Sequence, residues 1–352
     1  MYKGYRIIIN TAAGRRRYMQ YLVPVIMGCE IVDRYDIWVN TYNGTDIEFF
    51  RRLAAEFPKV NLVWQPDGVV DGIKSINAFY KGCVEEDAIY FKIDDDLIWI
   101  EPDGIRKMVD FRIDNPEYFL VSPLVINNSL TTYLLQVRDK LTLNNYYKSQ
   151  ANHHILWENG YFASQLHEWF MDNFLASGKW SELHIGNQPM AMTRFSINAV
   201  LWFGKDLKKI GGIVPGDDEE FLSCIYPTQI GAANCWNGDV VSVHFAFYPQ
   251  REFLDKRNIL ERYGKIIFRQ WKDSSLEAVN NKVQEILKYV NDNDSHLIKK
   301  TAPYVVKNTE KRSSYTIVDQ YKSKAKGLLY PLYYRFNKKK IEGARKFIIS
   351  DK

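Results

Sequence analysis

The sequence predicts an α/β protein in which helices cover both faces of a mostly parallel central sheet. In the first half, short and wholly apolar segments alternate with amphipathic ones. Such segments are typical of parallel strands that are buried on both sides and connected by helices. The chain has 352 residues, of which 46% are hydrophobic and 25% are charged, so it can form one large globular domain with an appendage.

The alternation assigns each element of the first half in turn. Strands are expected over residues 5–10, 36–41, 60–64, 88–93 and 118–126, and helices over 15–27, 45–57, 72–83 and 102–115. Further along, a helix is expected over 195–209 and a final strand over 239–247. Sheets of this kind bind ligands beyond the carboxyl ends of their strands, so that edge is where a site is expected.

Three consecutive aspartates follow the fourth expected strand, in the segment IYFKIDDDLIWIE. A buried strand gains no stability from three adjacent acids, because each charge must stay solvated or find a partner. The usual partner of clustered carboxylates at a strand end is a divalent metal ion, often one that also holds phosphate oxygens. If the strand conformation persists, Asp94 and Asp96 project to one side and Asp95 to the other. The alternative is a solvated acidic turn.

A second acidic cluster, Gly216-Asp217-Asp218-Glu219-Glu220, lies where a helix should begin. A helix N-terminus lowers the pKa of a carboxylate, so an aspartate there stays ionised and can accept a proton. The alternative is helix capping, which contributes about 1 kcal/mol. His244, within the last expected strand, is either a metal ligand beside the carboxylates or a hydrogen-bonded core histidine.

The expected helix over 72–83 carries Lys74 and Asn77 one turn apart, and therefore on one face. If its start faces the strand edge, Lys74 could meet a diphosphate and Asn77 could bond near the acidic loop. The alternative is a solvated polar face.

Taken in order, these motifs resemble the glycosyltransferases of the GT-A fold. They are G-x-K-x-x-N, IYFKIDDD, the glycine pair followed by GDDEEF, and the strand histidine, within roughly residues 4–250. The nearest type is the family-2-like, nucleotide-sugar-dependent inverting enzymes of bacterial surface-polysaccharide synthesis. Lys74 replaces their usual Arg, which keeps the charge but loses the bidentate fork. Their Glu-Asp base motif is matched by Asp217-Asp218, and the choice of base between the two stays open. The first loop, NTAAGRRRYMQ, departs from the usual family opening.

The resemblance implies a metal-dependent inverting glycosyltransferase that moves a sugar from a nucleotide donor, UDP-linked, to a carbohydrate or lipid-linked glycan acceptor. Mn²⁺ or Mg²⁺ would be held by Asp94, Asp96 and His244, and Asp218 or Asp217 would be the base. The other expected contacts are Thr11, Arg15, Lys74, Asn77 and Asp95 for the donor, and Trp157, Trp202, Trp236 and Glu219 for the acceptor. The catalytic domain would be residues 1–250, with a nucleotide-sugar-binding half (1–127) and an acceptor half (128–250), followed by a helical, basic extension (251–352).

The end of the chain is strongly basic. Residues 321–352 contain ten Lys and Arg and two acidic residues, which gives this segment a net charge of +8. The whole chain has a net charge of +5, so residues 1–320 have a net charge of −3. Cations interleaved with Leu and Tyr are typical of an interfacial membrane segment, where each cation near an anionic leaflet contributes about 1 kcal/mol. The alternatives are a solvated helical tail and an oligomer contact. Nucleic acid is not an expected partner, because the rest of the chain is acidic.

Four cysteines without a CxxC pair indicate reduced thiols rather than a disulfide framework or a zinc site. No apolar run approaches the length of a membrane span, and a strand begins within the first ten residues. We therefore expect a cytoplasmic protein whose basic end contacts the cytoplasmic face of a membrane. Two other functions are alternatives. One is a sugar nucleotidyltransferase, which needs a glycine-rich, basic phosphate loop after the first strand that AAGRRR matches only in part, and the other is a non-catalytic carbohydrate- or membrane-binding protein.

Overall fold

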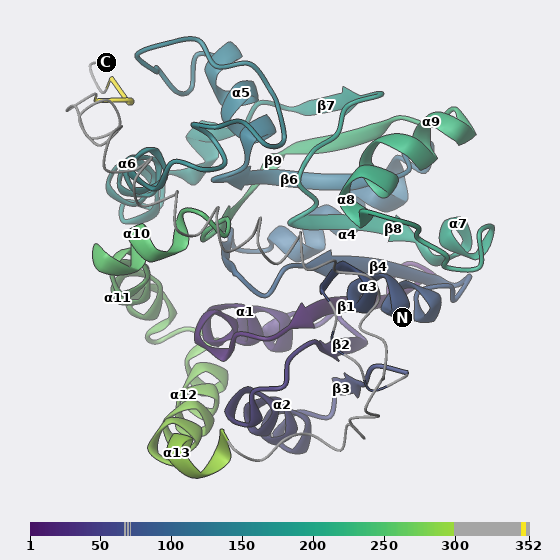
Figure 1. The fold of residues 1–352 in the computed structure, drawn as a ribbon, viewed down its shortest axis with the longest axis vertical. Helices are drawn as coiled ribbons and strands as arrows, with labels where there is room; N and C mark the ends of the chain where they lie inside the picture. Colours follow the sequence, from purple (N-terminus) through teal and green to yellow (C-terminus); the bar gives the residue numbers. More distant parts are fainter. Residues whose placement is uncertain (67, 69, 71, 299–345, 350–352) are drawn as a thin grey trace, which may run out of the picture.

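A nine-stranded sheet forms the centre of the molecule (Figure 1). The computed structural model describes residues 1–66, 68, 70, 72–298 and 346–349. The strand order is β3-β2-β1-β4-β8-β6-β9-β5, and β7 pairs with β9. The strands are β1 (Arg6–Ala13), β2 (Arg34–Val39), β3 (Val60–Val63), β4 (Ala88–Ile93), β5 (Leu97–Ile100), β6 (Val121–Ile126), β7 (Asn187–Met190), β8 (Ala199–Phe203) and β9 (Asn234–His244).

The N-terminal half of the sheet is parallel, as its apolar strands predicted. β1 pairs in parallel with β2 and β4, and β2 with β3. β8 runs antiparallel between β4 and β6, while β6 and β9 are parallel. The predicted α/β class is confirmed, with antiparallel strands added on the C-terminal side.

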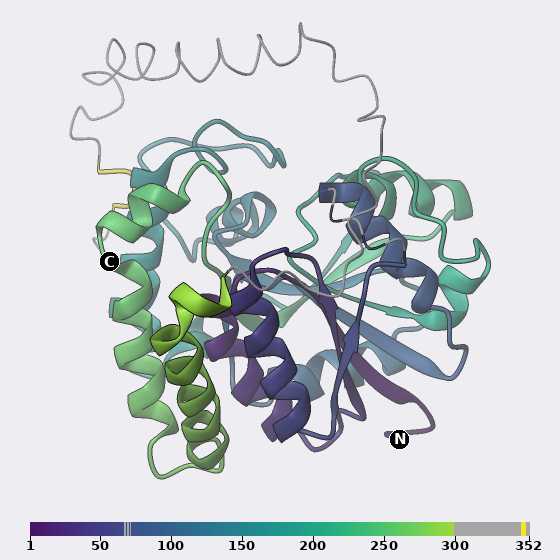
Figure 2. The same ribbon diagram turned by 60° about the horizontal axis from the view of Figure 1, so that its bottom comes forward.

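Helices cover both faces of the sheet (Figures 1 and 2). Ile7 and Ile9 of β1 face one apolar core with α1, α2, α4 and α12, whereas Ile8 faces a second core with α3, α5, α6 and α11. This follows from the alternation of side chains along a strand. The α-helices are α1 (Arg16–Gly28), α2 (Gly44–Glu56), α3 (Gly72–Phe79), α4 (Gly104–Asp114), α5 (Ser129–Val137), α6 (Gly160–Phe170), α7 (Gly204–Lys208), α8 (Asp218–Glu220), α9 (Tyr226–Ile230), α10 (Arg251–Lys256), α11 (Ile259–Trp271), α12 (Glu277–Asp292) and α13 (Asp294–Leu297).

The prediction of a single helix over 195–209 is wrong. Its apolar centre is β8, which lies between two other strands, and only Gly204–Lys208 is helical. All five residues of β8 are buried, and a short run that is apolar on every side fits a central strand as well as a helix. The sequence analysis also missed β5, which directly follows the aspartate triplet.

The helices after β9 pack against the N-terminal half, because α12 lies against α1 and α2 (Figure 2). Ile348 forms a β-bridge with Leu143, and Phe347 is buried against α6. Apart from residues 346–349, the expected membrane-contacting segment 321–352 lies outside the described residues. Among the helices that are described, none is both long and apolar enough to cross a membrane.

Candidate functional site

The aspartate triplet forms the turn between β4 and β5 and does not continue the strand. The Leu97 amide donates to the Asp94 carbonyl at 3.0 Å, which closes the turn. The strand ends at Ile93, so the condition under which Asp94 and Asp96 were expected to project to the same side is not met. Asp95 and Asp96 contact one arginine, whereas Asp94 contacts a lysine.

Arg15 joins two buried carboxylates of the triplet. Its Nε donates to Asp95 at 3.0 Å, its Nη2 also bonds Asp95, and its Nη1 lies 2.9 Å from Asp96 Oδ2. The Gly14 amide donates to Asp95 at 2.9 Å. Burial raises the pKa of Asp95 despite the opposing charge of Arg15. The loop after β1, predicted to bind the donor, is thus tied to the triplet by Arg15 and Gly14.

Asp96 lies among three basic side chains. Besides Arg15, it has His244 Nε2 at 3.5 Å and Arg251 Nη2 at 3.7 Å. Burial alone would raise the pKa of Asp96, but the charges of Arg15, His244 and Arg251 outweigh it and hold that pKa well below the usual range. Asp96 therefore stays ionised at neutral pH and can hold a cation.

His244 fits a metal site formed with Asp96. Two ligand atoms that each lie about 2.1 Å from one ion are about 3.0–3.4 Å apart, close to the 3.5 Å between His244 Nε2 and Asp96 Oδ1. Nδ1 of His244 lies 3.3 Å from the carbonyl of Asn127, an acceptor that would leave Nε2 free to bind a metal. Within residues 1–298 (except 67, 69 and 71) and 346–349, no three His, Cys, Asp or Glu side chains are grouped to hold a metal. This pair would supply two ligands and leave the other positions to phosphate oxygens and water.

Asp94 belongs to a separate ion pair, in which Lys92 is buried and Asp94 is half-buried. Its Oδ1 accepts from Lys92 Nζ at 2.5 Å, and its Oδ2 accepts from Asn198 at 3.2 Å. Lys92 lies on β4 and also donates to the Ile197 carbonyl at 2.9 Å. In this conformation Asp94 is directed toward Lys92 and Asn198, so we leave it out of the metal ligand set proposed below.

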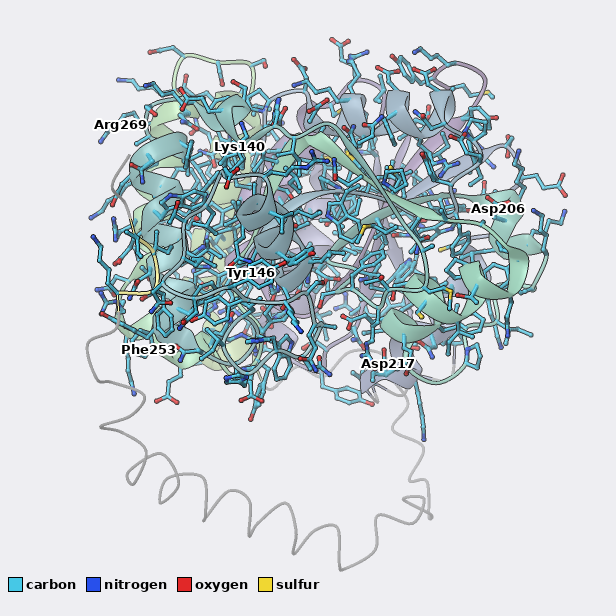
Figure 3. The ribbon with its side chains drawn as sticks, turned by 90° about the horizontal axis from the view of Figure 1, so that it is seen from above. Lys140, Tyr146, Asp206, Asp217, Phe253 and Arg269 are labelled. Carbon is cyan, nitrogen blue, oxygen red and sulfur yellow. The ribbon has the colours of Figure 1, made fainter. Side chains whose placement is uncertain are left out.

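The second acidic cluster begins α8, as predicted, and its members have different partners. Asp217 is the N-cap, accepts from the Glu220 amide at 3.1 Å and pairs with Arg194 at 2.9 Å, and it lies at the surface (Figure 3). Asp218 is buried and accepts from the Tyr80 hydroxyl at 2.9 Å. Glu219, an expected acceptor contact, is 3.0 Å from Arg194 Nε. Of the two candidate bases, Asp217 caps the helix and Asp218 lies among the buried groups.

A close approach between two loops brings Asp218 to Tyr80. Gly212 has a φ of +67°, and a Cβ there would lie 2.5 Å from the Tyr80 carbonyl, so this position requires glycine. Asn77 donates to the Gly216 carbonyl at 2.9 Å and ties α3 to the same loop. Asn77 therefore acts between two protein segments, while Lys74 lies exposed on α3.

Three of the expected contact residues are core residues instead. Trp202 and Trp236 are fully buried, with Trp202 stacked on Tyr90 and Trp236 edge-on to Phe195, so neither ring can receive an acceptor sugar. Thr11 is also fully buried, because it lies inside β1, which continues to Ala13. Trp157 differs. It is half-buried and packs on Phe247, whose ring contacts His244.

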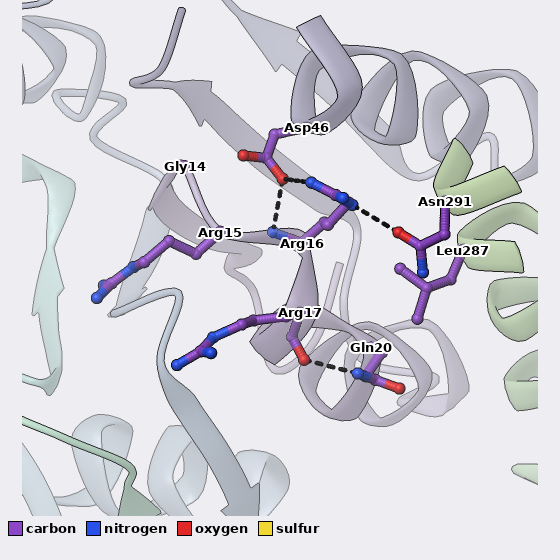
Figure 4. A pocket seen from close by; sticks show the side chains of 8 residues that line it. All are labelled: Gly14, Arg15, Arg16, Arg17, Gln20, Asp46, Leu287 and Asn291. Atoms are coloured by element: carbon purple, nitrogen blue, oxygen red, sulfur yellow. Dashed lines mark hydrogen bonds and ion pairs between the residues drawn. The ribbon is translucent and has the colours of Figure 1, made fainter. Parts of the chain in front are cut away.

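Beside Arg15, a hollow of about 250 Å³ opens between the starts of α1 and α2 and the end of α12 (Figure 4). Arg16 crosses it, bonding Asp46 and Asn291, while the Arg15 side chain points away from them. The residues that line it are Gly14, Arg15, Arg16, Arg17, Gln20, Asp46, Leu287 and Asn291.

The sequence analysis missed four residues that contact the acidic groups: Lys92, Arg194, Arg251 and Tyr80. Lys92 could have been found from the sequence, because it is a cation within a buried apolar strand, and burying a charge is costly without a partner. The others carry no local signal, because their partners are far away in the sequence.

No family model and no curated protein matches the sequence. Matching solved structures include a CMP-2-keto-3-deoxy-manno-octonic acid synthetase complexed with CTP, with 9% identity, a TM-score of 0.39, and coverage of 74% of this chain and 98% of that one. A 4-diphosphocytidyl-2C-methyl-D-erythritol synthase from Anaerococcus prevotii has 10% identity, a TM-score of 0.37, and coverage of 74% and 96%. A glucosyl-3-phosphoglycerate synthase from Mycobacterium tuberculosis, complexed with Mg²⁺ and UDP, has 12% identity, a TM-score of 0.35, and coverage of 74% and 80%. At these TM-scores the likenesses carry no argument about activity.

Proposed function

We propose that this chain is a nucleotide-sugar-dependent glycosyltransferase that inverts the anomeric centre. The observation that carries the proposal is the arrangement at the carboxyl end of β4. There the Asp96 carboxylate lies close to His244, Arg15 and Arg251, a group that we propose binds a cation and phosphates. Asp218 is a second, buried carboxylate, and it accepts a hydrogen bond from Tyr80. Charge that binds phosphate and a carboxylate that accepts a proton are the two requirements of direct displacement at an anomeric carbon.

The charges of the site match a diphosphate together with a divalent cation. The carboxylates of Asp95 and Asp96 balance the guanidinium groups of Arg15 and Arg251. A divalent cation at Asp96 and His244 would add two positive charges, which the diphosphate of a nucleotide sugar would neutralise. When bound, Mn²⁺ or Mg²⁺ would stabilise negative charge on the phosphates of the leaving group.

We propose Asp218 as the base. Burial raises its pKa above the usual value, which makes the ionised carboxylate a stronger proton acceptor. In the proposed reaction Asp218 takes the proton of an acceptor hydroxyl, and the hydroxyl oxygen forms a bond to the anomeric carbon. The bond from that carbon to the phosphate oxygen breaks, and its electron pair leaves with the nucleoside diphosphate beside Arg15 and Arg251. The acceptor is a carbohydrate or a lipid-linked glycan, with Trp157 as the available ring.

Donor turnover tests the proposal directly. The protein is incubated with UDP-, GDP- and CMP-sugars, with and without Mn²⁺, and nucleotide release to water is measured. We expect Mn²⁺-dependent release from one donor class. No turnover and no Mn²⁺-dependent nucleotide binding would exclude the proposal. Activity on a nucleoside triphosphate and a sugar 1-phosphate would instead indicate a nucleotidyltransferase.

A matched pair of variants tests the base. Asp218→Asn is expected to lower kcat by about 10²–10⁴-fold while nucleotide affinity is unchanged, because the amide cannot accept the proton. Asp217→Asn keeps a side chain that caps α8 and is expected to retain most of the activity. Equal losses of activity in the two variants, or loss of nucleotide binding in Asp218→Asn, would refute the role of Asp218.

A further inference from the structure

Tyr80 is a fully buried tyrosine in the short turn Tyr80–Gly82, which directly follows α3. Its hydroxyl donates to Asp218 Oδ2 at 2.9 Å. Burial and the Asp218 carboxylate raise the pKa of Tyr80 well above its usual value, so the hydroxyl keeps its proton and acts as a donor. This hydrogen bond joins the end of α3 to the start of α8.

The side chain and the backbone of Tyr80 are both held in place. Its ring centre lies 5.7 Å from that of Trp38 on β2 and 5.9 Å from that of Trp202 on β8. A Cβ on Gly212 would lie 2.5 Å from the Tyr80 carbonyl, so the loop after α7 is packed closely against the backbone of this turn. Because close packing leaves few rotamers open to a buried ring, the hydroxyl is directed at Asp218 before any ligand binds.

The Asp218 carboxylate is bonded at both of its oxygens. Oδ2 accepts from Tyr80, and Oδ1 accepts from the Glu219 amide at 3.0 Å. Each carboxylate oxygen has two lone pairs, so the group can still accept a proton from a hydroxyl. Two residues earlier, the Gly216 carbonyl accepts from Asn77 on α3 at 2.9 Å. The same helical segment therefore anchors both the loop that carries Asp218 and the carboxylate itself.

Three charged groups also face Asp218: Lys92 on β4, Asp94 in the triplet and Asp217 at the N-cap of α8. Burial raises the pKa of Asp218, whereas the charge of Lys92 and the hydrogen bond from Tyr80 lower it. The charges of Asp94 and Asp217 raise it. Lys92 forms its ion pair with Asp94, while Tyr80 bonds Asp218 directly.

We infer that Tyr80 is a positioning residue, whose hydroxyl fixes the direction of the Asp218 carboxylate and stabilises the ionised form that accepts a proton. The inference rests on the proposed function for the use of Asp218 as a base. If Tyr80 only filled the core with its ring, loss of the hydroxyl would leave the proton affinity of Asp218 unchanged. In a positioning role, loss of the hydroxyl raises that proton affinity, because a hydrogen bond to the charged form favours that form.

The Tyr80→Phe variant removes the hydroxyl and keeps the ring, and the proton affinity of Asp218 can be measured without turnover. The protein is labelled with ¹³C-aspartate, the Asp218 carboxyl signal is assigned from its absence in Asp218→Asn, and it is titrated by NMR. Tyr263→Phe is the matched control, because Tyr263 is equally buried and its hydroxyl lies 3.0 Å from His167 Nδ1 instead. We expect about a tenfold higher proton affinity in Tyr80→Phe and no change in Tyr263→Phe. Unchanged affinity in Tyr80→Phe would overturn the inference.

The wild type replaces Tyr80→Phe if that variant does not fold. It is labelled with ¹³Cζ-tyrosine, and the signal of Tyr80 is assigned from through-bond spectra. This signal should titrate with the same midpoint as the Asp218 carboxyl, because protonation of Asp218 weakens a hydrogen bond whose acceptor was charged. A Tyr80 signal that does not follow Asp218 would refute the positioning role.

Turnover separates the inference from the proposed function. In an active enzyme, Tyr80→Phe should move the acid limb of the pH–kcat profile to higher pH, while the KM for the donor changes less than about twofold. An unmoved acid limb would show that Tyr80 does not position the base. Absence of turnover in the wild type would refute the proposed function, whereas the NMR titration would still decide whether Tyr80 stabilises the ionised Asp218.

Discussion

Replacing Arg15 with Met tests how the acidic triplet is held. Arg15 contacts both Asp95 and Asp96, whose side chains are 3% and 5% exposed. Removing one partner of a buried ion pair costs about 3–5 kcal/mol, since the remaining charge is left uncompensated. Asp96 keeps His244 and Arg251, so the main loss falls on Asp95 and we expect the lower value, about 3 kcal/mol at pH 7.

The effect should depend on pH in a defined direction. In the wild type the folded pKa of Asp96 is depressed, so its contribution to stability is present above the ordinary carboxyl pKa and is lost as the pH falls through the folded pKa. In Arg15→Met the folded pKa values of Asp95 and Asp96 rise. The difference in unfolding free energy between the two proteins should therefore be largest at neutral pH and shrink as the pH falls toward 4.

Urea unfolding followed by circular dichroism at pH 7 and pH 4.5 measures this difference. Arg17→Met is the control, because Arg17 pairs with Asp255 at the surface, where an ion pair contributes about 0–1 kcal/mol. A loss below 1 kcal/mol in Arg15→Met, or an equal loss at both pH values, would refute the description of Arg15 as the counter-ion of the triplet. Added Mn²⁺ should restore part of the stability if Asp96 and His244 bind it.

The other predictions concern His167 and two tryptophans. Burial lowers the pKa of His167 to about 3, so the unfolded chain binds a proton that the folded chain does not, and stability falls as the pH drops below about 6.5. Between pH 7.5 and pH 5, His167→Gln should lose about 2 kcal/mol less unfolding free energy than the wild type, and parallel pH curves would contradict this. Trp236→Ala should cost about 3–5 kcal/mol by thermal or urea unfolding, because the ring is fully buried. Trp157→Ala should lower the unfolding free energy by less than Trp236→Ala does, because Trp157 is only half-buried, and it should raise the KM for the acceptor. An unchanged KM would show that Trp157 does not contact the acceptor.

The strands of the first half were predictable because each is short, apolar and bounded by polar segments. β4 matches its expected range, and the edge at its carboxyl end is where the acidic groups and the arginines meet. β8 was not predictable as a strand. Its residues are buried by neighbours on both faces, so no periodicity distinguishes it from a buried helix.

For the candidate site, residue types were easier to predict than partners. Asp96 and His244 were expected to hold the same metal ion, and the structure brings their side chains within 3.5 Å. The assignment of Trp202 to an acceptor surface failed, because composition does not show which aromatic rings the sheet covers. The side to which Asp94 projects could not be predicted, because a turn replaces the extended conformation on which side-chain alternation depends.

The sequence by itself determined the α/β class, the position of the triplet at the carboxyl end of β4 and the start of α8 at the second acidic cluster. These follow from local properties: strand length, apolar pattern and helix capping. Only the tertiary structure decided which basic residue each acid pairs with. Asp95 and Asp96 form ion pairs with Arg15, Asp94 with Lys92, and Asp217 with Arg194. The physical reason is that a buried charge is stabilised by whichever opposite charge the fold brings within a few ångströms, and sequence distance has no influence on that separation.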